Sequence, residues 1–276
     1  MNSSNIQKFL PIKERPHGIN IRSVLFDFDG TISTFRHGWE QVMIPLMEEL
    51  LTGGICGDPG VSAEVRKYVD ESTGIQTIHQ MKWLAEKVKA RFPGKDPDMW
   101  EYKKIYNQRL MDMISSRIHS VETGSVDPGE FIVPGAIDFL TYLKSRGYCL
   151  YLASGSDHPD VVHEAEVLGV KNFFTKIAGA PVGKVACSKQ AVMEEIIQTE
   201  QTGEPSVLIA GDGKVEIALG VEHGMYTLGL ATVEDSTSSA AGSLNRDKQK
   251  RLENAGAHTI AADFTPVSQI TEWYSL

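Results

Sequence analysis

The chain has 276 residues, of which 41% are hydrophobic and 23% charged, enough for one large domain or for a core with a smaller second domain. Its net charge of -9 argues against a nucleic-acid surface, which needs a basic patch, but allows a locally positive site for a small phosphorylated ligand. No stretch approaches the roughly 20 apolar residues of a membrane span, and residues 1–16 have no apolar core of signal-peptide length.

The three cysteines are odd in number and lack the close spacing of metal-binding pairs: Cys56, Cys149 and Cys187. This usage argues against a zinc site or a disulfide framework and predicts a protein of the reducing cytoplasm. Cys149 stands within an apolar run, so we expect it to be buried.

In chain order, residues 1–20 are predicted to form a loosely attached arm, and residues 23–26 a strand followed by a tight turn. Apolar residues then recur at helical spacing, with breaks that contain Gly and Pro, which predicts an all-helical domain inserted at residues 36–124. Its four helices are expected at residues 38–51, 62–73, 74–92 and 98–118.

After a linker rich in Gly and Pro, strands and helices alternate, which predicts an α/β fold with a Rossmann-like parallel sheet covered on both faces. This core comprises residues 21–35 and 125–276. Further strands are expected at 148–154, 173–179, 206–212 and 225–231, and helices at 136–147, 157–169, 188–199, 214–224 and 245–256.

Polar residues stand where three of the apolar runs end: Asp27, Ser154 and Asp212. The carboxyl ends of parallel strands line one crevice, so these side chains are expected to meet at one edge of the sheet. Asp29 and Glu216 add carboxylates there. Ionised carboxylates are costly to desolvate, and oxygen ligands of this kind favour a hard cation such as Mg²⁺.

A phosphate group is the second ligand expected at this edge. Either Lys184 or Lys189 could bind a phosphate oxygen, and the amides after Ser154, with Gly155 leaving the backbone unhindered, are expected to open a helix whose N-terminus attracts anions. A carboxylate nucleophile, a cation, a lysine, a hydroxyl and free amides suit phosphoryl transfer through an aspartyl phosphate.

The segments "DFDGT" (27–31), "LASGS" (152–156), a lysine at a helix start and "GDGKVE" (211–216) follow one another in this order. Together they resemble the motifs of the haloacid dehalogenase superfamily, and most of all its branch of phosphoglycolate phosphatase and β-phosphoglucomutase. The resemblance covers about residues 22–262, and it implies that the helical insert is the family's helical cap.

The resemblance implies a role for each motif. Asp27 attacks phosphorus, and Asp29 protonates the leaving alcohol and then activates the water that hydrolyses phospho-Asp27. Ser154 and Lys189 hold the transferring phosphoryl group. The carboxylates of Asp27 and Asp212 and the main-chain carbonyl of Asp29 bind Mg²⁺.

Two departures from the family pattern matter. Glu216 stands where the family usually has Asp, so it is expected to bind the metal through water or only to orient the phosphate lysine. Two lysines compete for the third motif, and we favour Lys189 over Lys184 because Lys189 opens a predicted helix.

The helical insert holds weaker candidates for substrate contact. Arg36 and His37 follow the first motif where the chain enters the insert, and Gln76 lies near a helix start. Each could contact substrate, and each could equally be a hinge or core residue.

We therefore expect a Mg²⁺-dependent phosphatase for a small phosphorylated metabolite, such as a sugar phosphate or phosphoglycolate. A phosphomutase shares every motif, and a phosphonatase would need a lysine from the cap. A non-catalytic phosphate-binding module is the other alternative, although the complete set of acids argues against it. No nucleic-acid or membrane partner is expected, and the sequence leaves the oligomeric state open.

Overall fold

The computed structural model describes residues 8–54, 57–185, 188–200, 206–235 and 242–276. Its centre is a seven-stranded sheet of order β1-β7-β6-β5-β2-β3-β4, and every pairing is parallel except that of β1 with β7. The predicted α/β fold with a Rossmann-like sheet is confirmed. The strands are β1 (Phe9–Pro11), β2 (Ser23–Phe26), β3 (Cys149–Asp157), β4 (Lys176–Ala180), β5 (Val207–Gly211), β6 (Tyr226–Leu230) and β7 (Thr259–Ala261).

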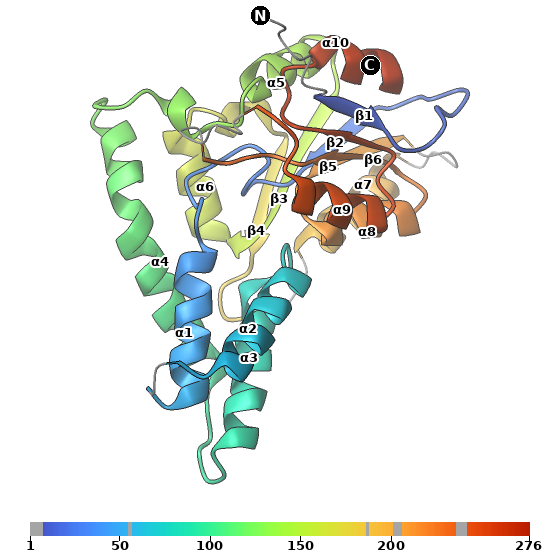
Figure 1. Ribbon diagram of the computed structural model, residues 1–276. Helices are drawn as coiled ribbons and strands as arrows, with labels where there is room; N and C mark the ends of the chain where they lie inside the picture. Colours follow the sequence, from blue (N-terminus) through green and yellow to red (C-terminus); the bar gives the residue numbers. More distant parts are fainter. Residues whose placement is uncertain (1–7, 55–56, 186–187, 201–205, 236–241) are drawn as a thin grey trace, which may run out of the picture.

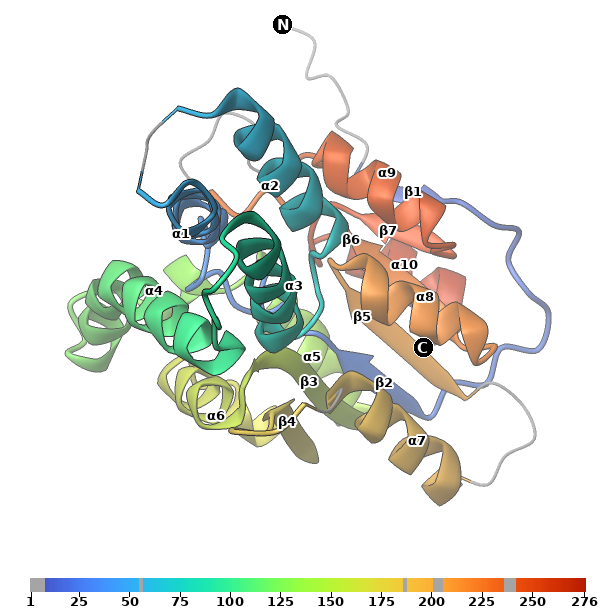
Figure 2. The same cartoon turned by 90° about the horizontal axis from the view of Figure 1, so that it is seen from below.

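Strand β2 lies between β5 and β3, and all four of its residues are buried because helices cover both faces of the sheet. Successive side chains point to opposite faces. Phe26 packs against Phe139 of α5, with ring centroids 6.2 Å apart, whereas Leu25 clusters with Met193 of α7. The sheet helices are α5 (Ala136–Ser145), α6 (His158–Val167), α7 (Ser188–Glu200), α8 (Lys214–Glu222), α9 (Arg246–Asn254) and α10 (Val267–Tyr274); Figure 2 shows them around the strands.

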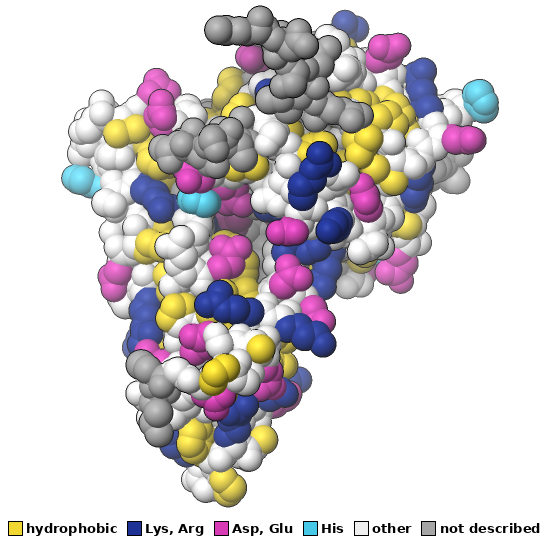
Figure 3. Space-filling model, viewed as in Figure 1, with side chains coloured by type: hydrophobic (Ala, Val, Ile, Leu, Met, Phe, Trp, Pro, Cys, Tyr) yellow, Lys and Arg dark blue, Asp and Glu magenta, His cyan; other side chains and the backbone are white. Residues whose placement is uncertain are grey.

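Of the α-helices between β2 and β3, the first four project away from the sheet (Figure 1). They are α1 (Glu40–Thr52), α2 (Pro59–Glu71), α3 (Thr77–Arg91) and α4 (Met99–Glu122), which we call the helical domain. Local signals set two of the starts, because the Asp58 side chain accepts from Gly60 and Val61 and the Asp98 side chain accepts from the amide of Trp100. Acidic and basic side chains both lie where this domain meets the core (Figure 3).

Three elements near the chain ends were not predicted: β1, β7 and α10. Phe9 pairs with Ala261 in antiparallel register, so the prediction of a loosely attached arm is wrong for residues 9–11. A three-residue strand that ends in Pro11 carries too little alternation to be recognised, and the tertiary pairing with β7 decides its conformation.

Cys149 is exposed, so the expectation that it is buried is wrong. It is the first residue of β3, where the strand is not yet covered, and burial begins at Leu150. Cys56 and Cys187 lie outside the described residues. Within the described part of the chain, no helix has the length and apolar character needed to cross a bilayer.

His258, just before β7, is held as a neutral imidazole inside the fold. Its ring lies edge-on between Tyr226 and Trp273, at centroid distances of 5.9 and 6.3 Å. Its Nδ1 accepts from the backbone amide of Thr227 at 3.2 Å. Burial, with a smaller contribution from the charge of Lys13, lowers the pKa of His258 to about 4 from its ordinary 6.5.

Because the folded pKa of His258 is depressed, the unfolded chain takes up this proton first as the pH falls. The contribution of neutral His258 to the unfolding free energy is therefore complete above pH 6.5, and it is lost progressively as the pH falls to about 4. We predict that His258→Asn, which keeps an acceptor near Nδ1 but does not titrate, reduces the fall in unfolding free energy over this range. Urea unfolding at several pH values measures it.

His17→Asn is the matched control, because His17 is exposed. Its pH profile should follow that of the wild type. If the His258→Asn profile also does so, the imidazole is not the group that destabilises the fold in acid.

Candidate active site

The acidic residues predicted to meet at the sheet edge do lie together. Asp27 follows β2, and its backbone amide donates to the carbonyl of Ala210 at 2.9 Å, which extends the ladder with β5 by one residue. Asp212 follows β5 directly. One carboxylate oxygen each from Asp27, Asp212 and Glu216 lie within 4.8 Å of one another.

Lys189, near the start of α7, places its ammonium among these acids. Its Nζ lies 2.8 Å from Asp27 Oδ1 and 2.8 Å from Glu216 Oε2. Burial opposes its charge, but the two carboxylates outweigh burial and raise the pKa of Lys189, so the side chain stays cationic. Lys184, the competing candidate, is exposed.

Asp27 itself is only 7% exposed. Burial raises the pKa of Asp27 well above its usual value; Lys189 works in the opposite direction, and the charges of Glu216 and Asp212 add to the increase. Lys189 compensates Asp27 only in part, because two further carboxylates lie beside it, and a bound cation would offset the remaining negative charge.

Glu216 has both carboxylate oxygens engaged. Oε1 accepts from the amide of Gly213 at 2.6 Å, which caps the start of α8, and Oε2 accepts from Lys189. A Cβ at Gly211 would lie 2.4 Å from Oε1, so the turn has room for Glu216 only because that residue is glycine. Of the two roles expected for Glu216, this geometry favours orienting Lys189.

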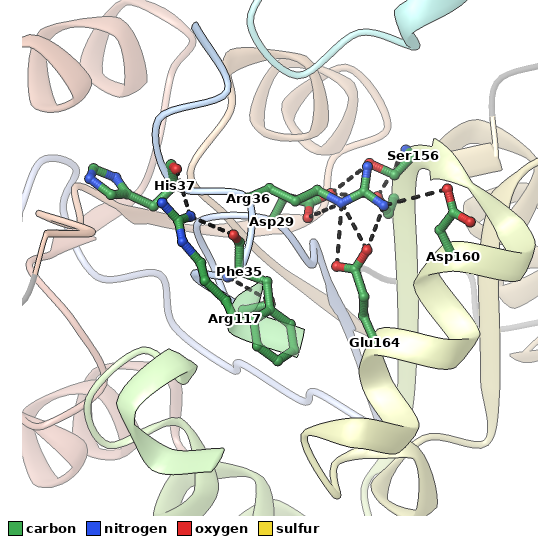
Figure 4. Close-up of polar contacts among 10 residues, drawn as sticks. Asp29, Phe35, Arg36, His37, Arg117, Ser156, Asp160 and Glu164 are labelled. Atoms are coloured by element: carbon green, nitrogen blue, oxygen red, sulfur yellow. Dashed lines mark hydrogen bonds and ion pairs between the residues drawn. The ribbon is translucent and has the colours of Figure 1, made fainter. Parts of the chain in front are cut away.

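The side chain of Asp29 lies apart from the acid cluster and faces β3. Its Oδ2 accepts from Ser154 Oγ at 3.0 Å and from Ser156 Oγ at 2.9 Å, and its Oδ1 lies 3.5 Å from Arg36 Nε (Figure 4). Two hydroxyl donors and one guanidinium thus fix the orientation of this carboxylate.

The expectation that Ser154 opens a helix is wrong. Strand β3 continues to Asp157, with a register shift against β4 after Ala153, and α6 begins at His158. Ser154 is buried and directs its hydroxyl to Asp29, while Gly155 and Ser156 face the cavity. The sequence did not predict that the strand continues past Ser154, because the Gly and Ser residues there do not alternate between apolar and polar.

Of the three candidates for substrate contact, Arg36 alone is placed in the cavity wall. Its guanidinium is bound by Glu164 of α6, with Nη2 2.6 Å from Oε1. The His37 side chain points away (Figure 4), and its backbone carbonyl accepts from Arg117 of α4 at 2.8 Å. Gln76 is buried at the start of α3, and its neighbours Ile75 and Thr77 line the wall instead.

A cavity of about 100 Å³ lies between the sheet edge and the helical domain. The domain touches the core on several sides: Lys103 and Asn107 of α4 donate to Asp157, and Arg251 of α9 lies 2.5 Å from Asp70 of α2. These contacts hold the helical domain against the core beside the acids.

Lys248 of α9 is a site residue that the sequence analysis missed. Its Nζ lies 2.6 Å from Asp212 Oδ2 and 2.6 Å from Glu234 Oε1, and it donates to Thr232 Oγ1 at 3.0 Å. The surrounding "NRDKQKRLEN" is typical of a solvated helix. One sequence signal was available: Lys248 lies four residues before Leu252, so the two side chains share one face of α9. Leu252 is buried on that face.

The donor set fits a hard divalent cation, because the acid cluster offers only carboxylate oxygens. Asp27 and Asp212 flank the same point at adjacent strand ends. Each is also paired with one buried lysine, Lys189 and Lys248 respectively, which it shares with a second carboxylate. That pairing keeps the site stable before any cation binds.

A family model described as haloacid dehalogenase-like hydrolase matches residues 21–224. No curated protein matches the sequence. Three solved structures illustrate the similarity in fold; at these identities they show the fold alone. β-Phosphoglucomutase from Clostridium difficile is 16% identical, with a TM-score of 0.62, and the match covers 92% of this chain and 97% of that one. A predicted phosphoglycolate phosphatase from Haemophilus somnus is 14% identical, with a TM-score of 0.58 and coverage of 91% of this chain and 98% of that one. A phosphonoacetaldehyde hydrolase-like protein from Oleispira antarctica is 18% identical, with a TM-score of 0.58 and coverage of 100% of this chain and 97% of that one.

Replacing Lys248 by Met removes the cation that separates Asp212 from Glu234. We predict that Lys248→Met lowers the unfolding free energy by about 3 kcal/mol in a chelating buffer, because it leaves buried carboxylates without a partner. Excess Mg²⁺ should recover part of this loss, since a cation beside Asp212 replaces the missing charge. Urea unfolding with chelator and with Mg²⁺ measures both effects.

Lys250→Met is the control, because Lys250 lies exposed on the same helix. It should change stability little in either buffer. Equal losses in the two variants, or a loss at Lys248 that Mg²⁺ leaves unchanged, would contradict the assignment of Lys248 to the site.

Proposed function

The chain belongs to the haloacid dehalogenase-like hydrolases, and on that premise we propose that it is a Mg²⁺-dependent phosphatase that hydrolyses a small phosphate monoester through a phosphorylated Asp27. The observation that carries the proposal is the position of Asp27, buried at a strand end, paired with Lys189 and next to Asp212. A nucleophilic carboxylate needs these neighbours to approach an anionic phosphoryl group.

The proposed reaction has two steps. In the first, a carboxylate oxygen of Asp27 forms a bond to phosphorus while the bond to the alcohol oxygen breaks, and Asp29 gives that oxygen a proton. In the second, the oxygen of water forms a bond to phosphorus and gives a proton to Asp29, while the bond between phosphorus and the Asp27 oxygen breaks. Phosphate then leaves and Asp27 is regenerated. The serine hydroxyls that hold Asp29 Oδ2 keep it oriented for both transfers.

We assign binding of the phosphoryl group to Lys189, Ser154 and the backbone at Gly155. Lys189 lies within reach of any oxygen bound near Asp27, and Gly155 is part of the cavity wall. Ser154 also orients Asp29. Removing Lys189 should therefore weaken both the binding of phosphate and the ionisation of the nucleophile.

We assign the cation to the carboxylates of Asp27 and Asp212 and the main-chain carbonyl of Asp29, with Glu216 acting through Lys189. Bound Mg²⁺ would offset the charge of these acids and of the phosphoryl oxygens. We further propose that residues 36–124 act as a cap that encloses the substrate. The cysteine content favours the cytoplasm as its compartment.

Two of the three alternatives fit the site less well. A phosphonatase needs a lysine from the cap, but the cap residues described along the cavity wall include none, and Lys87 and Lys89 are paired with Glu64 and Asp96. A binding module would have no need for the full set of acids. A phosphomutase shares every residue of the site and differs in whether water or a second alcohol accepts the phosphoryl group.

We predict that Asp27→Asn lowers turnover of p-nitrophenyl phosphate at least about a thousandfold, because the amide is a poor nucleophile. Chelation of divalent cations should abolish wild-type turnover. Mass spectrometry of acid-quenched wild type should detect phosphate on Asp27.

Lys184→Met is the control for Lys189→Met, because Lys184 is exposed. The first should keep normal turnover, and the second should lose it. Substantial turnover by Asp27→Asn would overturn the proposed mechanism. Transfer of phosphate to an added sugar phosphate in preference to water would identify a mutase.

A further inference from the structure

Resting on the proposed function, we propose that the cavity takes the phosphate monoester of an uncharged, hydroxyl-bearing alcohol and rejects one whose alcohol carries a carboxylate. A second anion on the substrate needs a cation to receive it. Across the described cavity wall, the cations are Lys189, which is committed to Asp27, and Arg36.

Arg36 is already neutralised by the protein. Its Nη2 lies 2.6 Å from Glu164 Oε1 and 3.7 Å from Asp160 Oδ2, and its Nε lies 3.5 Å from Asp29 Oδ1 (Figure 4). The Arg36 side chain is 10% exposed and that of Glu164 is 1% exposed. A substrate carboxylate would have to displace a buried, multiply hydrogen-bonded partner, which costs more than the new pair returns.

The neighbouring cations are also committed. Lys248 serves Asp212 and Glu234, and Lys103 serves Asp157. His37 Nδ1 lies 4.0 Å from Glu234 Oε2, so even a protonated His37 faces an acid. None of these three is part of the described wall.

The charge balance of the wall points the same way. The wall and the ionic partners of its charged groups hold three cations, Lys189, Arg36 and Lys248, against seven carboxylates: those of Asp27, Asp29, Asp160, Glu164, Asp212, Glu216 and Glu234. One divalent cation would offset part of this excess of negative charge, and the phosphoryl dianion would then increase it again. A further carboxylate would enter a negative site with no cation free to pair with it.

The wall supplied by the helical domain suits hydroxyl groups. It combines neutral hydrogen-bonding groups with apolar and aromatic surface: Trp39, Thr73, Thr77, Gln80, Tyr106 and Leu110. Hydroxyl, amide and phenol groups can each bond an alcohol, and rings cover the apolar faces of a carbon chain.

The test compares glycerol 3-phosphate with 3-phosphoglycerate, which share their three carbons and differ in a hydroxymethyl group against a carboxylate. We expect kcat/KM to be at least about a hundredfold higher for glycerol 3-phosphate, since the carboxylate would be buried unpaired. Thr77→Lys should narrow this ratio by adding a cation to the wall. Thr77→Met, of similar length and no charge, should not.

The outcomes separate this inference from the proposed function. If p-nitrophenyl phosphate is hydrolysed and 3-phosphoglycerate is used as well as glycerol 3-phosphate, the inference is wrong and the phosphatase assignment stands. A clear preference for phosphoethanolamine over glycerol 3-phosphate would also overturn it, because the site would then select a cationic alcohol.

If no ester is hydrolysed, the proposed function is wrong. Calorimetry with the same pair of esters then decides the inference. Tighter binding of glycerol 3-phosphate supports it, and equal or tighter binding of 3-phosphoglycerate overturns it.

Discussion

The buried ammonium of Lys189 bridges two carboxylates, Asp27 and Glu216, at 2.8 Å each, and the rest of the site depends on this bridge. Removing an ionised carboxylate from water is expensive unless a partner compensates. The lysine compensates Asp27, and Glu216 fixes the lysine while it also caps α8. Strand β2 can therefore be followed directly by a buried acid, Asp27, while the centre of the sheet stays packed.

The same principle is repeated one strand away. Lys248 compensates Asp212 and Glu234, and Thr232, which accepts from Lys248, donates to the carbonyl of Gly30 at 2.8 Å. A Cβ on Gly30 would lie 2.3 Å from Asp212 Oδ2, so the turn after β2 and the acid after β5 pack in contact. Two acid–lysine units thus face each other across neighbouring strand ends.

Much of this arrangement could be predicted from the sequence. Buried apolar runs that end in Asp27, Ser154 and Asp212 require the side chains to share one edge, because parallel strands align their carboxyl ends. Lys189 could be chosen over Lys184 from its place at a helix start. The helices of residues 40–122 could be predicted because each carries a full helical period with clear breaks.

Other features depend on tertiary contacts that no local pattern encodes. Lys248 resembles any solvated lysine until α9 packs beside Asp212. Strands β1 and β7 have three residues each and are defined by pairing across the sheet, β1 with β7 and β7 also with β6. The pairing of Arg36 with Glu164 could not be predicted either, because the two residues lie 128 positions apart in the chain.

The two ends of the cavity differ in the charged groups that line them, and this difference bears on the proposed selectivity. At the sheet edge, Lys189 and Lys248 each serve two carboxylates, so the acids keep a net negative charge that the proposed cation would offset. Beneath the helical domain, Arg36 carries the one guanidinium on the described wall. This group binds Glu164 and so ties α6 to the point where the chain enters the domain. Arg36 thereby joins the helical domain to the core and orients Asp29, and the charge used for that purpose is not available to a substrate. On the proposed function, the phosphoryl chemistry belongs to the sheet edge, and the choice of alcohol belongs to the neutral wall opposite it.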